Sequence, residues 1–169
     1  MIDISDKIEQ IKKECKMQGF CVCYEELGLD REECENNAAD RVAGLWGFTP
    51  DMMTLQADIW HDYRFGNMDS VSVRLKNSQK FEIHVSQSPN GLWAVECDFF
   101  LSDWGRGAFP CIWNREQYES RKEAIVSEFE RQAKDERFQS DKIGAKLIAL
   151  MADKIAEMFP AHQQLELAL

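Results

Sequence analysis

The spacing of apolar residues changes twice along this chain. Near the N-terminus, Ile4, Ile8 and Ile11 recur every three or four residues, which predicts an amphipathic helix over residues 3–18. In the middle of the chain, apolar and polar residues alternate instead, and after residue 120 the helical spacing returns. The alternating segments are 55–63, 70–75, 80–86 and 92–101. Because alternation is the pattern of a half-buried strand, the order predicts helices, then a sheet, then helices.

Turn residues between the alternating segments indicate how the strands connect. The polar residues Asn77, Ser78 and Gln79 predict a hairpin, and a second turn is expected at residues 89–91 and a third at 103–107. Pro110 interrupts the last apolar run, residues 108–113, which therefore suits only an edge strand. The sequence predicts an antiparallel β-meander of four to five strands.

Helix starts are marked by residues that cap the first turn. Asp30 with Glu33 predicts a helix over residues 30–45, and Ser120 with Glu123 predicts one over residues 120–137. Asp141 is expected to cap the last helix, which ends before residue 160.

These elements define an α+β chain with N-terminal helices, a central antiparallel sheet and two C-terminal helices. With 169 residues, 44% of them hydrophobic, the chain has the size of one domain that buries its own core. We expect a single domain over residues 1–169. Its expected parts are a helical acidic part (1–52), the sheet (54–113) and the C-terminal helices (120–159).

Two features favour a cytoplasmic protein. The chain has no apolar run near the roughly 18 residues that span a bilayer, and its charged start, MIDISDKIEQIKK, does not resemble a secretion signal. The six cysteines are then expected to be reduced thiols. The spacing of Cys15, Cys21, Cys23 and Cys34 does not suit zinc, so we expect neither a metal nor a cofactor. Whether these four cysteines bind a metal or are redox-active stays open.

The net charge of −10 is concentrated in the first part of the chain. Residues 1–69 hold 15 acids and 7 bases, whereas residues 70–169 hold 15 acids and 13 bases. This sign disfavours direct binding of nucleic acid and favours a basic protein partner. A solvated face that only aids solubility is the alternative.

The acids around the helix predicted at residues 30–45 are the candidate contact residues. Exposed tryptophans are typical interface anchors, so Trp60, Trp104 and the neighbouring Arg106 are also candidate contact residues. The predicted partner-binding residues are Glu25, Glu26, Asp30, Glu32, Glu33, Glu35, Asp40, Asp58, Trp60, Asp62, Trp104 and Arg106.

No catalytic motif is present, and the chain is not expected to be an enzyme: it has no G-x-S-x-G, P-loop, H-E-x-x-H or G-x-G-x-x-G. Two alternatives stay open. One is a metal-dependent, nuclease-like enzyme with a carboxylate and imidazole cluster on the sheet, formed by Glu82, His84, Glu96 and Asp98. The other is a homodimeric structural protein joined through the terminal helices.

Residues 91–130 combine a strand pair, a glycine-rich turn and a helix start, with Trp93, Gly105, Gly107 and the run SRKEAI at 120–125. This segment resembles a small module of phage- and plasmid-encoded proteins. The resemblance implies a mobile-element origin and no defined activity. In size and charge the chain also resembles small acidic anti-CRISPR and anti-restriction proteins. We therefore expect an inhibitor that binds and blocks a basic nucleic-acid-handling surface.

Overall fold

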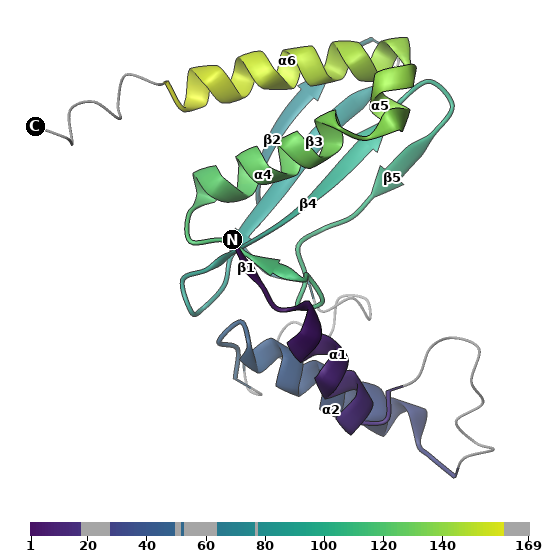
Figure 1. Cartoon of the computed structure of the whole chain (residues 1–169), viewed down its shortest axis with the longest axis vertical. Coiled ribbons are helices and arrows are strands. Elements are labelled where there is room, and N and C mark those ends of the chain that lie inside the picture. The colour runs from purple at the N-terminus through teal and green to yellow at the C-terminus, as the bar shows by residue number, and fades with distance from the viewer. Residues whose placement is uncertain (18–27, 50–51, 53–63, 77, 161–169) are drawn as a thin grey trace, which may run out of the picture. The chain divides into compact units, whose positions relative to one another are not determined.

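The structure, a computed structural model, describes residues 1–17, 28–49, 52, 64–76 and 78–160 (Figure 1). It confirms the α+β class, with helices at both ends of the chain and an antiparallel sheet between them. The chain groups into two compact units, and the expected single domain stays a prediction. The first unit comprises Met1–Asn67, Ser86–Ala94 and Pro110–Glu119, and the second comprises Met68–Val85, Val95–Phe109 and Ser120–Leu169.

The first unit contains two of the predicted helices, α1 (Ser5–Glu14) and α2 (Arg31–Gly44), which pack against each other. The Asp30 carboxylate accepts a hydrogen bond of 3.0 Å from the Glu33 amide, so the predicted cap is confirmed. Small side chains on α2 let α1 approach closely. The buried core of the unit is formed by Ile4, Ile8, Ile11, Ala38, Ala39, Val42, Ala43, Trp46, Phe48, Phe65, Ala94 and Ile112.

Trp46 lies at the centre of this core. Its indole nitrogen donates a hydrogen bond of 2.9 Å to the carbonyl of Ile112, which satisfies a polar group that burial would otherwise penalise. The ring of Phe65 meets Trp46 edge-on at 5.0 Å and stacks on Phe48 at 5.2 Å. These contacts connect parts of the chain that are far apart in sequence.

The N-terminus differs from its prediction. Residues Ile2–Asp3 form strand β1, which pairs antiparallel with β6 (Glu116–Gln117), and the helix begins only at Ser5. The Ile4 amide donates to the carbonyl of Arg115 at 2.8 Å, which holds the chain extended before the helix starts. A strand of two residues is too short to leave a pattern in the sequence.

The second unit is built on a four-stranded antiparallel sheet with the order β2-β3-β4-β5. Val71 lies opposite Ile83 and Ser72 opposite Glu82, so the predicted hairpin is confirmed with its apolar residues on one face. The strands are β2 (Asp69–Arg74), β3 (Lys80–Gln87), β4 (Trp93–Phe100) and β5 (Gly105–Gly107).

The predicted edge strand at residues 108–113 is wrong. The edge strand is instead β5, within the segment expected to be a turn, because the turn closes earlier with a hydrogen bond of 2.7 Å from the Leu101 amide to the Trp104 carbonyl. Pro110 has no amide to donate, and its carbonyl accepts from Phe65 at 3.0 Å. The strand predicted at residues 55–63 lies outside the described residues.

Three helices follow the sheet: α4 (Arg121–Ala133), α5 (Glu136–Ser140) and α6 (Lys142–Met158). The caps predicted at Ser120 and Asp141 are confirmed, since their side chains accept from the amides of Glu123 and of Ile143 and Gly144. Two C-terminal helices were expected, and the short α5 between them was missed. Asp135 caps α5 by accepting from the Arg137 amide at 2.9 Å.

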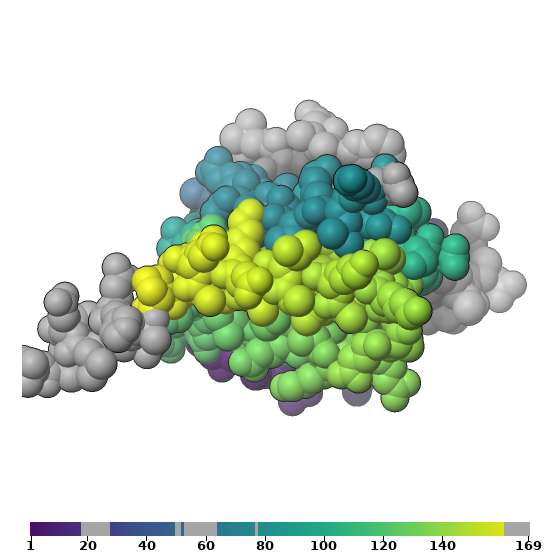
Figure 2. Space-filling model, turned by 90° about the horizontal axis from the view of Figure 1, so that it is seen from above, coloured from purple at the N-terminus to yellow at the C-terminus, as the bar shows by residue number. Residues whose placement is uncertain are grey.

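The helices cover one face of the sheet, and α6 lies between the blue-green of the first strands and the green of α4 (Figures 1 and 2). Phe138 of α5 is fully buried and contacts Phe81 at 5.2 Å and Phe99 at 4.7 Å. Phe81 and Phe99 therefore point toward the helices. Because successive side chains of a strand alternate between the two faces, Glu82, His84 and Asp98 point to the face turned away from the helices.

Candidate functional sites

The first candidate is the acidic face of α2, defined here by the exposed side chains of Glu32, Glu33 and Asp40. The opposite face of the helix is buried through Cys34, Ala38 and Val42. The helix therefore has no exposed apolar stripe, and its solvent-facing side is charged.

The two arginines of α2 are each engaged by a carboxylate of the same unit. Arg31 donates to Glu35 at 2.8 Å, one turn along the helix, and Arg41 donates to Glu14 of α1 at 2.5 Å. The hydrogen bond from Arg41 lowers the pKa of Glu14. Because these pairs use both arginines of the helix, the charge of the acidic face is not neutralised within α2.

Some of the predicted acids have structural roles of their own. Asp30 caps α2, Glu35 pairs with Arg31, and Glu32 and Glu33 lie in the first turn, where the helix dipole favours negative charge. The predicted contact residues Glu25, Glu26, Asp58, Trp60 and Asp62 lie outside the described residues.

Trp104 and Arg106 belong to the second unit, whereas the α2 acids belong to the first. Trp104 is 36% exposed, and its ring packs on Phe99 at 4.8 Å while the guanidinium of Arg137 lies over it at 4.2 Å. Arg106 lies 3.6 Å from the carboxylate of Glu96. Much of the Trp104 ring is thus covered by its own chain.

The second candidate is a polar cluster on the sheet face that is turned away from the helices. Donor atoms of Glu82, His84 and Asp98 all lie within 4.8 Å of one another, and Glu82 and His84 are buried. Glu96, which the sequence grouped with them, faces Arg106 instead. The structure therefore assembles three of the four residues of the metal-dependent alternative.

Lys80 completes this cluster and was missed by the sequence analysis. Its ammonium group donates to Glu82 at 2.6 Å and also contacts the carboxylate of Asp98. The signal was present, since Lys80 precedes Glu82 by two residues on the same face of a strand.

The charges in the cluster shift each other's pKa. Burial raises the pKa of Glu82, but hydrogen bonds from Lys80 and Arg74 outweigh it, and the net pKa is lowered. The carboxylates of Asp98 and Glu82 raise the pKa of Lys80. Burial lowers the pKa of His84 against the opposing effect of both carboxylates.

The cysteines do not form a metal centre among the residues that the structure describes. Cys15, Cys34, Cys97 and Cys111 form no disulfide with one another, and none belongs to a described group of side chains close enough to share an ion. Cys21 and Cys23 lie outside the described residues.

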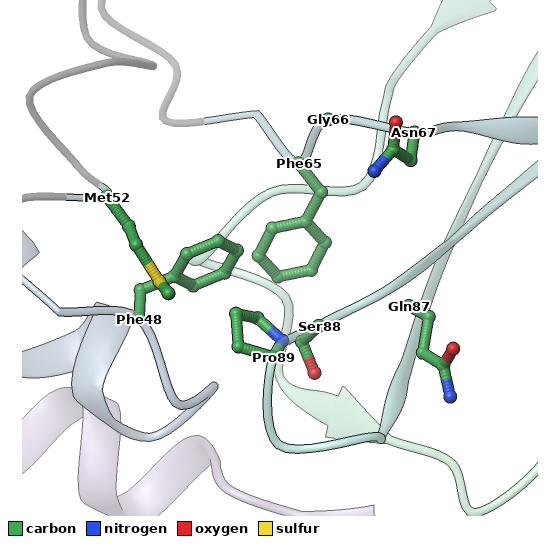
Figure 3. A pocket seen from close by; sticks show the side chains of 8 residues that line it. All are labelled: Phe48, Met52, Phe65, Gly66, Asn67, Gln87, Ser88 and Pro89. Carbon is green, nitrogen blue, oxygen red and sulfur yellow. The ribbon is translucent and has the colours of Figure 1, made fainter.

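A cavity of about 280 Å³ lies in the first unit (Figure 3). Phe48, Phe65 and Pro89 form its apolar wall, and Asn67 and Gln87 add amide groups. None of the described residues that line it is titratable.

In comparisons with protein-family models, curated proteins and solved structures, nothing matches this chain. Across the described residues, every helix is too short or too polar to cross a membrane.

Proposed function

We propose that the protein is a non-enzymatic interaction protein whose acidic face on α2 binds a basic protein surface that otherwise holds nucleic acid. The supporting observation is that Glu32, Glu33 and Asp40 are exposed while both arginines of the helix are paired elsewhere. The protein would act as a small acidic inhibitor of the anti-CRISPR or anti-restriction kind.

Charge complementarity identifies the chemistry of the partner. A face with three carboxylates and no apolar stripe gains little from burial of apolar surface, so attraction to lysine and arginine side chains must supply the association. Such side chains line surfaces that bind the phosphates of nucleic acid. Binding is therefore expected to weaken as salt rises and to compete with nucleic acid.

The proposal is tested with the triple variant Glu32→Gln, Glu33→Gln, Asp40→Asn. Its matched control is Glu130→Gln, Asp153→Asn, Glu157→Gln, which removes the same charge from three exposed acids of α4 and α6. Partners are captured from host lysate at low and high salt, and each captured protein is purified and tested for nucleic-acid binding.

The expected partner is basic, binds the wild type and the control, and releases both at high salt. The α2 variant is expected to lose at least about tenfold in affinity, since several charge contacts disappear together. The partner should also bind nucleic acid less well when the protein is present. Equal retention of the α2 variant and the control would contradict the proposal.

A further inference from the structure

We propose that Glu82, His84 and Asp98 bind a divalent transition-metal ion on the sheet face of the second unit that is turned away from the helices. The proposal is independent of the acidic face of α2. It rests on the geometry of three side chains, on the burial of His84 and on the position of Lys80.

His84 is the observation that points to a ligand. The side chain is only 5% exposed, and within the described part of the chain neither ring nitrogen has a hydrogen-bond partner. Buried polar atoms in folded proteins nearly always have such a partner. One of these nitrogens lies within 4.8 Å of the carboxylate oxygens of Glu82 and Asp98, so a cation between them gives it a partner.

The donor set indicates the class of ion. Two carboxylate oxygens and one imidazole nitrogen suit Mn²⁺, Fe²⁺ or Zn²⁺ better than Mg²⁺ or Ca²⁺, which prefer oxygen alone. Ligands of one such ion lie at about 2.0–2.2 Å from it and roughly 3 Å from one another. The three donor atoms lie within 4.8 Å of one another, so shifts of the two carboxylate groups by roughly an ångström bring them to this spacing.

The residues that lie directly opposite the three donors on the neighbouring strands are small. On β2, Ser72 lies opposite Glu82 and Ser70 lies opposite His84. On β5, Gly107 lies opposite Asp98, and a Cβ atom there would stand 3.7 Å from the Asp98 carboxylate. The bulky side chains close to the donors come from other positions: Arg74 of β2 donates to Glu82 at 2.6 Å, and the ring of Phe109 lies 5.0 Å from that of His84.

Lys80 holds the place of the ion when no metal is bound. Its ammonium group bridges the carboxylates of Glu82 and Asp98, which a divalent cation would also bridge. The Lys80 side chain is 26% exposed, so it has a path to solvent when it is displaced. Metal binding is thus an exchange of one cation for another, and Lys80 weakens it by competition.

The experiment measures binding of Mn²⁺ to the full chain by equilibrium dialysis, with Mg²⁺ as the comparison ion. Mn²⁺ is chosen because it binds thiols weakly, so the cysteines contribute little to the measured binding. The variants are Glu82→Gln, His84→Gln and Lys80→Met. The matched control is Glu96→Gln, a carboxylate of β4 outside the three donors.

The wild type is expected to bind one Mn²⁺ per chain, and more tightly than Mg²⁺. Glu82→Gln and His84→Gln should weaken binding at least tenfold, and Glu96→Gln should leave it within about twofold, because only the first two lose a ligand. Lys80→Met should tighten binding about tenfold or more, since a positive charge leaves the site. A gain in affinity cannot come from unfolding, so this variant keeps the test decisive.

Two results would overturn the proposal. One is a wild type that binds no Mn²⁺, in which case the cluster is an ion-pair network closed by Lys80. The other is binding that Glu82→Gln and His84→Gln leave unchanged.

Discussion

The carboxylate of Glu128 on α4 hydrogen-bonds the thiol of Cys97 on β4, and both side chains are 1% exposed. Gln132 donates a second hydrogen bond to Glu128 at 2.8 Å, and Arg131 pairs with its other oxygen. Burial nevertheless raises the pKa of Glu128, and it also raises the pKa of Cys97. A carboxyl group therefore lies in the core between helix and sheet, where its charged form is penalised.

Replacement of Glu128 by glutamine should change how stability depends on pH. Because the folded state raises the pKa of Glu128 above its ordinary value of 4.5, the unfolded state ionises first as pH rises. The contribution of Glu128 to stability is then complete below about pH 4.5 and is lost as pH rises through the folded pKa. Glu128→Gln removes this loss, so in urea titrations its free energy of unfolding should rise relative to that of the wild type as pH increases above about 4.5.

The control for this prediction is Glu128→Ala. It removes the charge as well, but it leaves a cavity and takes an acceptor from Gln132, so it should cost about 2 kcal/mol. If Glu128→Gln were as destabilised as Glu128→Ala at neutral pH, the charged carboxylate would stabilise the folded state. That result would contradict the predicted direction of the pH dependence.

Two neighbouring glycines should respond oppositely to alanine. Gly47 has a φ of +79°, and a Cβ atom there would lie 2.8 Å from the backbone nitrogen of Asn90. Gly47→Ala should therefore cost about 2 kcal/mol or more. Gly44, at the end of α2, has nothing within 4 Å of the added atom, and Gly44→Ala should gain up to about 1 kcal/mol. Urea unfolding followed by circular dichroism measures both; similar losses would contradict the assigned turn.

Loss of the hydroxyl that caps α4 should destabilise the second unit. The side chain of Ser120 accepts from the Glu123 amide at 3.1 Å, so Ser120→Ala leaves that amide without its partner and should cost about 1 kcal/mol. Ser127→Ala, in the interior of the same helix, should change stability by less than about 0.5 kcal/mol. Thermal unfolding compares the two, and equal effects would mean that the cap contributes nothing.

Phe138 should be among the costliest positions to truncate. It is fully buried and contacts both Phe81 and Phe99, so Phe138→Ala should cost about 3–5 kcal/mol. Phe100 is 44% exposed, and Phe100→Ala should cost less than about 1 kcal/mol. Chemical denaturation of the two variants tests this, and comparable losses would argue against the assigned core of the second unit.

Local signals in the sequence were sufficient for most of the elements. The caps at Asp30, Ser120 and Asp141 act within three residues, and the structure confirms them. Alternation located β2, β3 and β4 because successive side chains of a strand point to opposite faces, so the apolar residues of one face recur at every second position. Two segments failed. Residues 2–3 pair with residues 116–117, which lie far away in the chain. Strand β5 pairs with the neighbouring β4 across a turn that is shorter than predicted.

The polar cluster on the sheet was also only partly predictable from the sequence. The sequence placed Glu82 and His84 on one face of a strand, but it could not show that Asp98 of the next strand approaches them or that Lys80 bridges the carboxylates. Pairing between strands decides those distances, and pairing depends on turns and packing that composition does not specify.

The sequence by itself determined the α+β class, the helix starts, the central strands and the negative charge ahead of the sheet, because each follows from periodicity, capping or simple counting. Only the tertiary structure decided that both arginines of α2 are paired within the first unit, that Glu128 is buried beside Cys97, and that His84 lies without a hydrogen-bond partner next to two carboxylates. Burial and close approach arise when distant segments pack together, and a linear pattern does not record which segments meet.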